Sequence, residues 1–198
     1  MYYSFDHERE LESIVNSPSP GVPLKQFSDA CSHFSNLFGV LEIAFKYVKI
    51  NFVRQVDEFA KASSTTSTLQ AMVEKDIEAG QAKKYESLTR KLLRLKRALE
   101  MARVLFEEII ATQPDSSLKD AVFKAYSQVL APHHGHALQE SASSGFVFLP
   151  SRAELLLMIN ETEETAKVHM QSYVTASKSV TEYLDKFYQS KNLDIDFP

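Results

Sequence analysis

The sequence predicts an all-α protein, and three observations lead to this prediction. Long segments repeat their apolar residues with a period near 3.6, which is typical of helices. No run of residues alternates between apolar and polar in the manner of a strand. Glycine is scarce, with five residues among 198. Because this length, a hydrophobic content of 44% and a net charge of −4 are ordinary for a globular protein, we expect residues 1–198 to form a single domain.

The first third of the chain is expected to form two helices separated by prolines. The first covers His7–Asn16, because the prolines of Ser17–Pro23 prevent its continuation. The second covers Leu24–Ala62 as one long helix with a bend near Gly39. It ends at the polar cluster Ser63–Ser67, whose small hydroxyl side chains favour turns.

Three helices are expected in the middle of the chain. Leu69–Ala79 is followed by Gly80, which suits a helix C-cap. The strongest helical segment is Ser87–Ile110, and it stops before Pro114. Ser117 is a suitable N-cap for a further helix that runs to about residue 130.

Capping patterns mark the helices near the C-terminus. A proline turn at residue 132 leads into a helix that ends near Ala142. Ser151 and Glu154 form a capping-box pattern that opens a helix over residues 152–159. Asn160 and Glu163 resemble a second capping box, which opens the last helix. That helix carries an apolar stripe made of Ala166, Met170, Tyr173, Val180, Leu184 and Phe187.

Three arginines share one side of the strongest helix. Arg90, Arg94 and Arg97 are spaced by four and three residues, so their like charges repel one another unless a bound anion offsets the repulsion. The guanidinium group presents a fork of donors that matches phosphate or carboxylate oxygens. We therefore hypothesise an anionic ligand, and the alternative is a solvated helix face. The negative net charge excludes an overall basic field, so no nucleic-acid partner is expected.

The histidines that follow the proline turn raise the alternatives of a metal site and an enzyme. His133, His134 and His136 would need further ligands to hold zinc, and no Cys or Asp pattern supplies them nearby. The sequence has no nucleophile elbow, no phosphate-binding glycine loop and no di-iron pattern. We expect no enzyme activity, no cofactor and no metal, and a metal-dependent hydrolase stays a third hypothesis.

The single cysteine, Cys31, rules out an internal disulfide and fits a reducing compartment. It lies among apolar residues, so we expect it to act as a small buried hydrophobe. The first ten residues lack the apolar core of a secretory signal, and no apolar stretch approaches the roughly 18 residues that span a bilayer, so we expect a cytoplasmic protein. A set of apolar side chains is expected mostly in the core, with some able to line a pocket: Phe34, Leu37, Phe38, Leu41, Phe45, Phe52, Phe106, Phe123, Phe146 and Phe148.

Four segments together resemble the glycolipid transfer protein superfamily. They are SPSPGVPLKQFSDACSHFSNLFG, SLTRKLLRLKRALEMARVLFEEIIA, APHHGHAL and HMQSYVTAS. The resemblance covers the chain in order from about Leu11 to Asp196, so it is more specific than any single motif. Within the superfamily the chain is most similar to the ceramide-1-phosphate transfer proteins of the plant accelerated-cell-death type.

The resemblance implies a two-layer helical sandwich that encloses an apolar cavity for one sphingolipid and holds its headgroup at the surface. It implies a carrier of ceramide-1-phosphate between membranes, and not an enzyme. The expected partners are this lipid and, transiently, a membrane surface, and the protein is expected to be a monomer.

The resemblance also assigns roles to individual residues. Arg90 and Arg94 match the arginines that grip the phosphate, and the glycolipid branch has a tryptophan in place of Arg94. Arg97 matches a third basic position, and His134 matches the histidine that contacts the ceramide amide oxygen. His136 stands where the family often has an interfacial tryptophan.

Two residues depart from the family pattern. Asn51 replaces an aspartate that accepts hydrogen bonds from the ceramide, and Gln55 replaces a lysine of the phosphate branch. Arg54 lies on nearly the same helix face as Asn51, so it is a candidate compensating cation, with a solvated charge as the alternative. Both departures are expected to weaken lipid binding, so a sphingolipid sensor or protein-interaction module is the alternative to a carrier.

Overall fold

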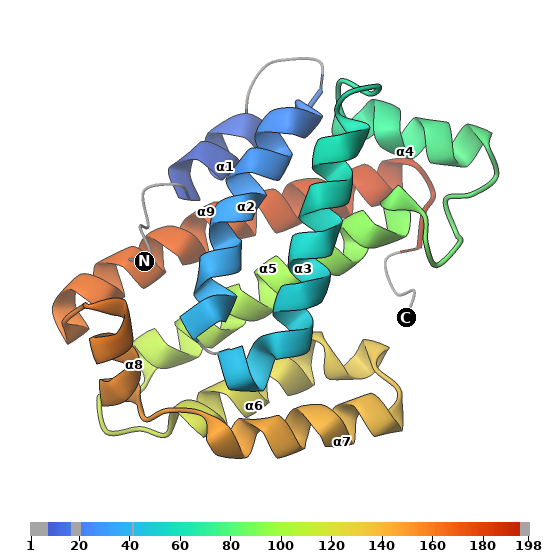
Figure 1. The fold of residues 1–198 in the computed structure, drawn as a ribbon. Helices are drawn as coiled ribbons and strands as arrows, with labels where there is room; N and C mark the ends of the chain where they lie inside the picture. The colour runs from blue at the N-terminus through green and yellow to red at the C-terminus, as the bar shows by residue number, and fades with distance from the viewer. Residues whose placement is uncertain (1–7, 17–20, 41, 195–198) are drawn as a thin grey trace.

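The computed structural model describes residues 8–16, 21–40 and 42–194, and within them the side chains of residues 12–16, 21–32 and 49–194. In these ranges the chain is helical, apart from turns, loops and one isolated antiparallel bridge between Pro23 and Thr68. Figure 1 shows two layers, which confirms the predicted all-α sandwich. The layer in front holds α1 (Glu8–Val15), α2 (Leu24–Val40) and α3 (Glu42–Ala62), and α5 (Leu88–Ala111) and α9 (Glu163–Ser190) cross behind it.

The remaining elements surround this pair of layers. They are α4 (Leu69–Glu78), α6 (Leu118–Val129), the 3₁₀ turn η2 (Ala131–His133), α7 (His136–Gly145), the 3₁₀ turn η3 (Phe146–Phe148) and α8 (Arg152–Ile159). In Figure 1, α6 and α7 lie together at one end of the α2–α3 pair, and α4 lies at the other end. Helix α7 ends at Gly145, three residues past the predicted end near Ala142, and leads directly into the 3₁₀ turn η3.

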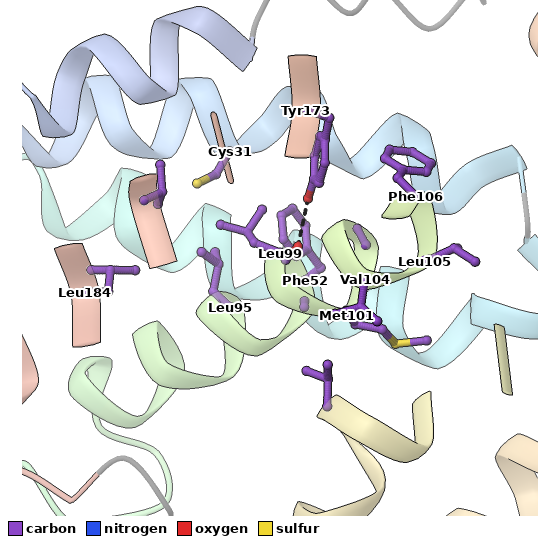
Figure 2. Packing of buried hydrophobic residues seen from close by; sticks show 14 of the residues in the cluster. Cys31, Phe52, Leu95, Leu99, Met101, Val104, Leu105, Phe106, Tyr173 and Leu184 are labelled. Carbon is purple, nitrogen blue, oxygen red and sulfur yellow. Dashed lines mark hydrogen bonds between the residues drawn. The ribbon is translucent and has the colours of Figure 1, made fainter. Parts of the chain in front are cut away.

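Helix α5 is the centre of the fold. It contacts α9 and α6 along much of its length, and α3 and α4 pack against other parts of it. Ser87 caps it as predicted, accepting a hydrogen bond from the backbone N–H of Arg90 at 3.0 Å. In Figure 2 the hydroxyl of Tyr173 on α9 donates to the carbonyl of Leu99 within the buried apolar cluster, at 3.1 Å. Because neighbours cover nearly every side, α5 also buries four of its cations, Arg90, Lys91, Lys96 and Arg97.

The prediction of one long helix over Leu24–Ala62 is wrong. Helices α2 and α3 lie side by side with the chain reversing between them, and residue 41 at the reversal lies outside the described residues. The reversal follows Gly39, a poor helix former, by two residues. A straight helix of that length would extend about 58 Å at 1.5 Å per residue, far beyond a small domain, whereas reversal lets both halves pack on the core.

Helix ends show which capping predictions hold. Gly80 follows α4 with a positive φ of 65°, and the Ser151 capping box with Glu154 is present at the start of α8. The box predicted at Asn160 is wrong, because this residue is the left-handed C-cap of α8, with a φ of 56°. The second box uses Thr162 and Thr165 instead, at the start of α9.

The side chain of Gln70 on α4 joins three parts of the chain. Its Oε1 accepts from the backbone N–H of Val22 at 2.9 Å, and its Nε2 donates to the hydroxyl of Tyr183 on α9. A Cβ added at Gly21 would lie 2.8 Å from the same Oε1. Position 21 therefore has no room for a side chain while Gln70 occupies this position.

The buried apolar cluster includes many of the predicted core residues. Cys31 is fully buried as predicted, and burial raises the pKa of its thiol. Phe123 and Phe148 are instead mostly exposed, because α6 and η3 turn these rings away from the core, and the predicted residues from 34 to 45 have side chains outside the described ones. Within the described ranges no single helix is long and apolar enough to cross a membrane, although 136–148 and 152–159, which meet at 80°, pass that test as a bent pair.

Arg152 links the end of α5 to the start of α9. Its Nη1 donates to the carbonyls of Thr112 and Gln113 at 3.2 and 3.1 Å, and its Nη2 lies 2.6 Å from Oε2 of Glu163. Arg152 itself is buried, so these bonds replace water.

We expect Arg152→Ala to lower the free energy of unfolding by about 2–4 kcal/mol, because two carbonyls and one carboxylate lose their donor. Urea denaturation followed by circular dichroism measures this change. The control is Lys178→Ala, since Lys178 is exposed and lies 3.9 Å from Glu182, so its effect should stay below about 0.5 kcal/mol. A loss for Arg152→Ala no larger than that of the control would contradict the expectation.

Candidate functional site

A pocket of about 500 Å³ opens where α3, α5, the end of α6 and α7 meet. Its volume lies in the range of small-molecule sites. Its wall combines polar and apolar side chains, and no Asp or Glu is among the described residues that line it. The lining residues are Asn51, Phe52, Arg54, Gln55, Tyr85, Arg94, Arg97, Ala98, Tyr126, Leu130, His133, His134, Gly135, Leu138, Ser141, Ala142, Ser144, Gly145 and Phe148.

Helix α3 presents three polar residues to the pocket. Asn51, Arg54 and Gln55 share one face because they are spaced by three and four residues. Arg54 Nη2 donates to Oδ1 of Asn51 at 3.2 Å, and both side chains are exposed. Gln55 is 3% exposed, and Phe52 and Phe59, which precede and follow it on α3, are buried as well. The helix thus supplies two neutral amides and one cation.

Arg94 is held by the loop that precedes α5. Its Nη2 donates to the backbone carbonyl of Tyr85 at 2.9 Å, and its Cζ lies 4.4 Å from the centre of the Tyr85 ring. Its Nη1 is buried and has no hydrogen-bond partner within the described part of the chain. Burial lowers the pKa of Arg94, and Arg90 and Arg54 lower it further, whereas Tyr85 and Glu86 raise it. The pocket wall therefore holds a charged donor, Nη1 of Arg94, that is shielded from water and has no protein acceptor among the described residues.

The lysines beside Arg94 on α5 are neutralised by carboxylates. Lys91 pairs with Glu58 and Glu86, and Lys96 Nζ lies 2.6 Å from Oδ1 of Asp185. Burial lowers the pKa of Lys91, but its hydrogen bonds to the two glutamates outweigh burial and raise the pKa overall. The hydrogen bond from Lys91 lowers the pKa of Glu86 in turn. None of these acids lines the pocket, so they satisfy the lysines and leave the pocket positive.

The three predicted arginines do not form a solvated face. Arg90 and Arg97 are buried, at 7% and 5% exposure, and Arg94 is partly buried, so that alternative is wrong. Arg94 and Arg97 line the pocket together with Arg54, whereas Arg90 is not among the lining residues. The structure thus brings together three guanidinium groups, two of which were predicted as a stripe on α5.

The histidines have different environments. His134 lines the pocket, and its Nδ1 lies 2.9 Å from the hydroxyl of Tyr126. Burial lowers the pKa of His134, and nearby His133 and Arg97 lower it further, so the ring is neutral at pH 7. His136 is exposed outside the pocket. Within the described residues no group of three or more His, Cys, Asp or Glu side chains is placed to hold a metal ion.

Sequence reasoning missed two aromatic residues of the site. Tyr126 lies near the end of α6, and the proline turn brings His134 back over it, so the two meet eight residues apart. Tyr85 lies in an irregular loop between α4 and α5, where no periodic pattern predicts the direction of a side chain. An aromatic residue nine positions before an arginine carries no local signal.

Comparison with known proteins places these observations in a family context. The sequence model of the family described as Glycolipid transfer protein (GLTP) matches residues 22–161. The chain is 53% identical over 189 residues to Accelerated cell death 11 of Arabidopsis thaliana, covering 96% of this chain and 92% of that protein. It is 28% identical over 196 residues to the ceramide-1-phosphate transfer protein of Xenopus tropicalis, covering 92% and 91%. An Asp-to-Asn variant of Arabidopsis ACD11, solved in complex with C12 ceramide-1-phosphate, matches with a TM-score of 0.92 and 52% identity, over 98% of this chain and 96% of that one.

We expect His134 to make the protein less stable in mild acid. Its pKa in the folded state is lowered, so below the ordinary value of about 6.5 the unfolded state takes up a proton that the folded state resists. Stability from this group is present above that value and is lost as the pH falls towards the folded pKa. Thermal melts at pH 7.5 and 5.5 should show a smaller drop in melting temperature for His134→Gln than for the wild type.

The matched control is His136→Gln, which replaces an exposed ring outside the pocket. If the melting temperature drops equally for His134→Gln and the wild type between the two pH values, burial of His134 does not cause the loss of stability in mild acid.

Proposed function

The chain belongs to the glycolipid transfer protein family, and from this premise we propose that it carries ceramide-1-phosphate, or a related phosphorylated sphingolipid, between membranes. The observation that carries the proposal is the cationic pocket, which Arg54, Arg94 and Arg97 line with no carboxylate among the described lining residues. Two of the comparisons support it, since a variant of ACD11 is solved with ceramide-1-phosphate and the Xenopus relative is a ceramide-1-phosphate transfer protein.

The phosphate binds at the arginines of α5. A phosphomonoester carries about −1.5 to −2 charges at pH 7, if it behaves as on protein side chains, so it balances the charge of two guanidinium groups. Arg94 offers Nη1, the buried donor that has no partner in the described part of the chain, and Arg97 adds a second cation. Arg90, buried on the same helix, adds to the positive potential. Charge-assisted bonds of this kind are short and strong.

The ceramide amide binds between α3 and the His134 segment. A neutral His134 ring contacts the amide oxygen, with Tyr126 fixing the ring through Nδ1. Asn51 lies across the pocket on α3. Its Oδ1 accepts from Arg54 and keeps a second lone pair for a ceramide donor, and its NH₂ group can donate to a headgroup oxygen.

Transfer involves no bond making or breaking. Moving a lipid chain from a bilayer into an apolar cavity exchanges one apolar medium for another, whereas exposing it to water costs about 0.8 kcal/mol per CH₂. A family of lipid transfer proteins acts in this way, as carriers and not as enzymes. We propose that the lipid chains extend from the apolar part of the pocket wall, which includes Phe52, Leu130 and Leu138.

The amides at positions 51 and 55 are compatible with binding. In Arabidopsis ACD11 a variant with an asparagine in place of an aspartate is solved with ceramide-1-phosphate bound. An uncharged amide at one acidic position therefore does not prevent complex formation in that protein. Arg54, which lines the pocket beside Asn51, compensates for the cation that Gln55 lacks. These points favour the carrier over a sensor or interaction module.

Membrane contact is proposed to be transient and to involve the pocket rim. Phe148, which is 66% exposed, and Leu138 both line the pocket and face outwards in part. Exposed apolar side chains of this kind bury themselves in the interfacial region of a bilayer. We propose that the protein acts as a monomer in the cytoplasm and docks only while it loads or releases lipid.

Arg94→Ala should slow vesicle-to-vesicle transfer of fluorescent ceramide-1-phosphate by about ten- to a hundredfold, because charge-assisted bonds to the phosphate are lost. The matched control is Arg103→Ala on the same helix, because Arg103 pairs with Glu107 at 2.7 Å and does not line the pocket. Intact folding is checked by circular dichroism. Absence of transfer by the folded wild type, or equal rates for both variants, would argue against the proposal.

Asn51→Asp/Gln55→Lys should increase ceramide-1-phosphate transfer, by up to about tenfold, because it restores a charged acceptor for the ceramide and a cation for the phosphate. The same vesicle assay measures it. Each single variant is measured as well, since an aspartate at position 51 also attracts Arg54 and removes part of its charge from the pocket. An unchanged rate in the double variant would show that the two amides do not limit transfer.

A further inference from the structure

Tyr85 is an exposed aromatic residue at the edge of the cationic pocket. It is 63% exposed and lines the pocket from the loop that joins α4 to α5. This loop is anchored directly after Tyr85, since Ser87 caps α5 and Glu86 pairs with Lys91 at 3.1 Å. Ser87 N also donates to the carbonyl of Lys84. The position of Tyr85 is therefore set by the backbone around it. This anchoring does not account for a large aromatic ring that is left exposed at the edge of the pocket.

Two different parts of Tyr85 contact the same guanidinium group. The ring covers the Cζ of Arg94 at 4.4 Å from its centre, which is within the range of a cation–π contact. The backbone carbonyl accepts from Nη2 at 2.9 Å. The remaining Nη1 is buried and has no partner among the described residues.

This arrangement separates the face of the guanidinium from its edge. An anion binds a guanidinium in its plane, through the N–H groups at the edge, and a ring stacks on its flat face. The Tyr85 ring therefore does not compete with a phosphate for donors. It fixes the plane of Arg94, and the carbonyl of Tyr85 accepts from Nη2, so that the Nη1 edge is held in one orientation.

We propose that Tyr85 is a positioning residue that makes the pocket selective for a phosphate-bearing headgroup by holding Arg94 in a binding-ready orientation. The inference rests on the proposed function, because it assumes that the lipid phosphate binds at Arg94. A flexible arginine loses side-chain freedom when it binds an anion, and an arginine already held loses less. Tyr85 thus increases affinity for the phosphate without touching the rest of the lipid.

The test compares two soluble short-chain lipids, ceramide-1-phosphate and the matching ceramide without phosphate, by titration calorimetry. Tyr85→Ala should weaken binding of ceramide-1-phosphate about two- to fivefold, the range of an exposed cation–π contact, and leave ceramide binding unchanged. Tyr85→Phe keeps the ring and should stay within about twofold of the wild type. Phe123→Ala, which removes an exposed ring outside the pocket, is the matched control.

A double-mutant cycle distinguishes positioning from general loss of structure. In an Arg94→Ala background, Tyr85→Ala should have no further effect on ceramide-1-phosphate binding, because its action passes through Arg94. Equal losses for the two lipids, or the same loss with and without Arg94, would overturn the proposal.

A lipid-free measurement keeps this inference separate from the proposed function. If Tyr85 holds the guanidinium, the Nη protons of Arg94 should give separate NMR signals that merge at a lower temperature in Tyr85→Ala than in the wild type and Tyr85→Phe. Failure of the wild type to bind ceramide-1-phosphate would reject the proposed function alone. Identical merging temperatures in all three proteins would reject the role of Tyr85.

Discussion

A central helix that is covered on nearly every side must still satisfy its charges, and the rest of this structure follows from how α5 meets that requirement. Burying a cation is costly unless a partner replaces water. Lys91 and Lys96 receive carboxylates from α3, α9 and the preceding loop, and Arg103 receives Glu107. Arg94 receives only a carbonyl and an aromatic ring among the described residues. The same helix thus holds the core together and leaves the Nη1 of Arg94, in the pocket wall, without a hydrogen-bond partner among the described residues.

The guanidinium group of Arg94 gives the pocket its affinity for an anion. A neutral partner for Arg94 keeps the wall positive, whereas a carboxylate would have satisfied it and repelled a phosphate. The amides of Asn51 and Gln55 follow the same logic, since they add hydrogen-bonding groups without cancelling the arginines. The lipid chains need no such groups, because moving them from a bilayer into an apolar cavity exchanges one apolar medium for another. In the proposed function, a few side chains at the rim select the headgroup.

Sequence patterns predicted whatever depends on local periodicity. The helix that bears Arg94 and the N-caps Ser87 and Ser117 are where the pattern places them, because capping and spacing act within one turn. The reversal between α2 and α3 was missed, since a helical pattern continues through it and only the packing of these helices on each other, and of α3 on α5, favours two helices. Tyr85 was missed for the related reason that a loop has no period. The family resemblance identified His134, and the structure added its contact with the Tyr126 hydroxyl.

The contact between Gln70 and Gly21 has a consequence for the history of this chain. Any side chain at position 21 would collide with Oε1 of Gln70, and that oxygen is occupied by the N–H of Val22. A larger residue at position 21 therefore requires the amide of Gln70 to move away or a shorter residue to replace it, and either change leaves the N–H of Val22 without this acceptor. We expect the two sites to change together among orthologues, a covariation imposed by steric exclusion across 49 positions of sequence.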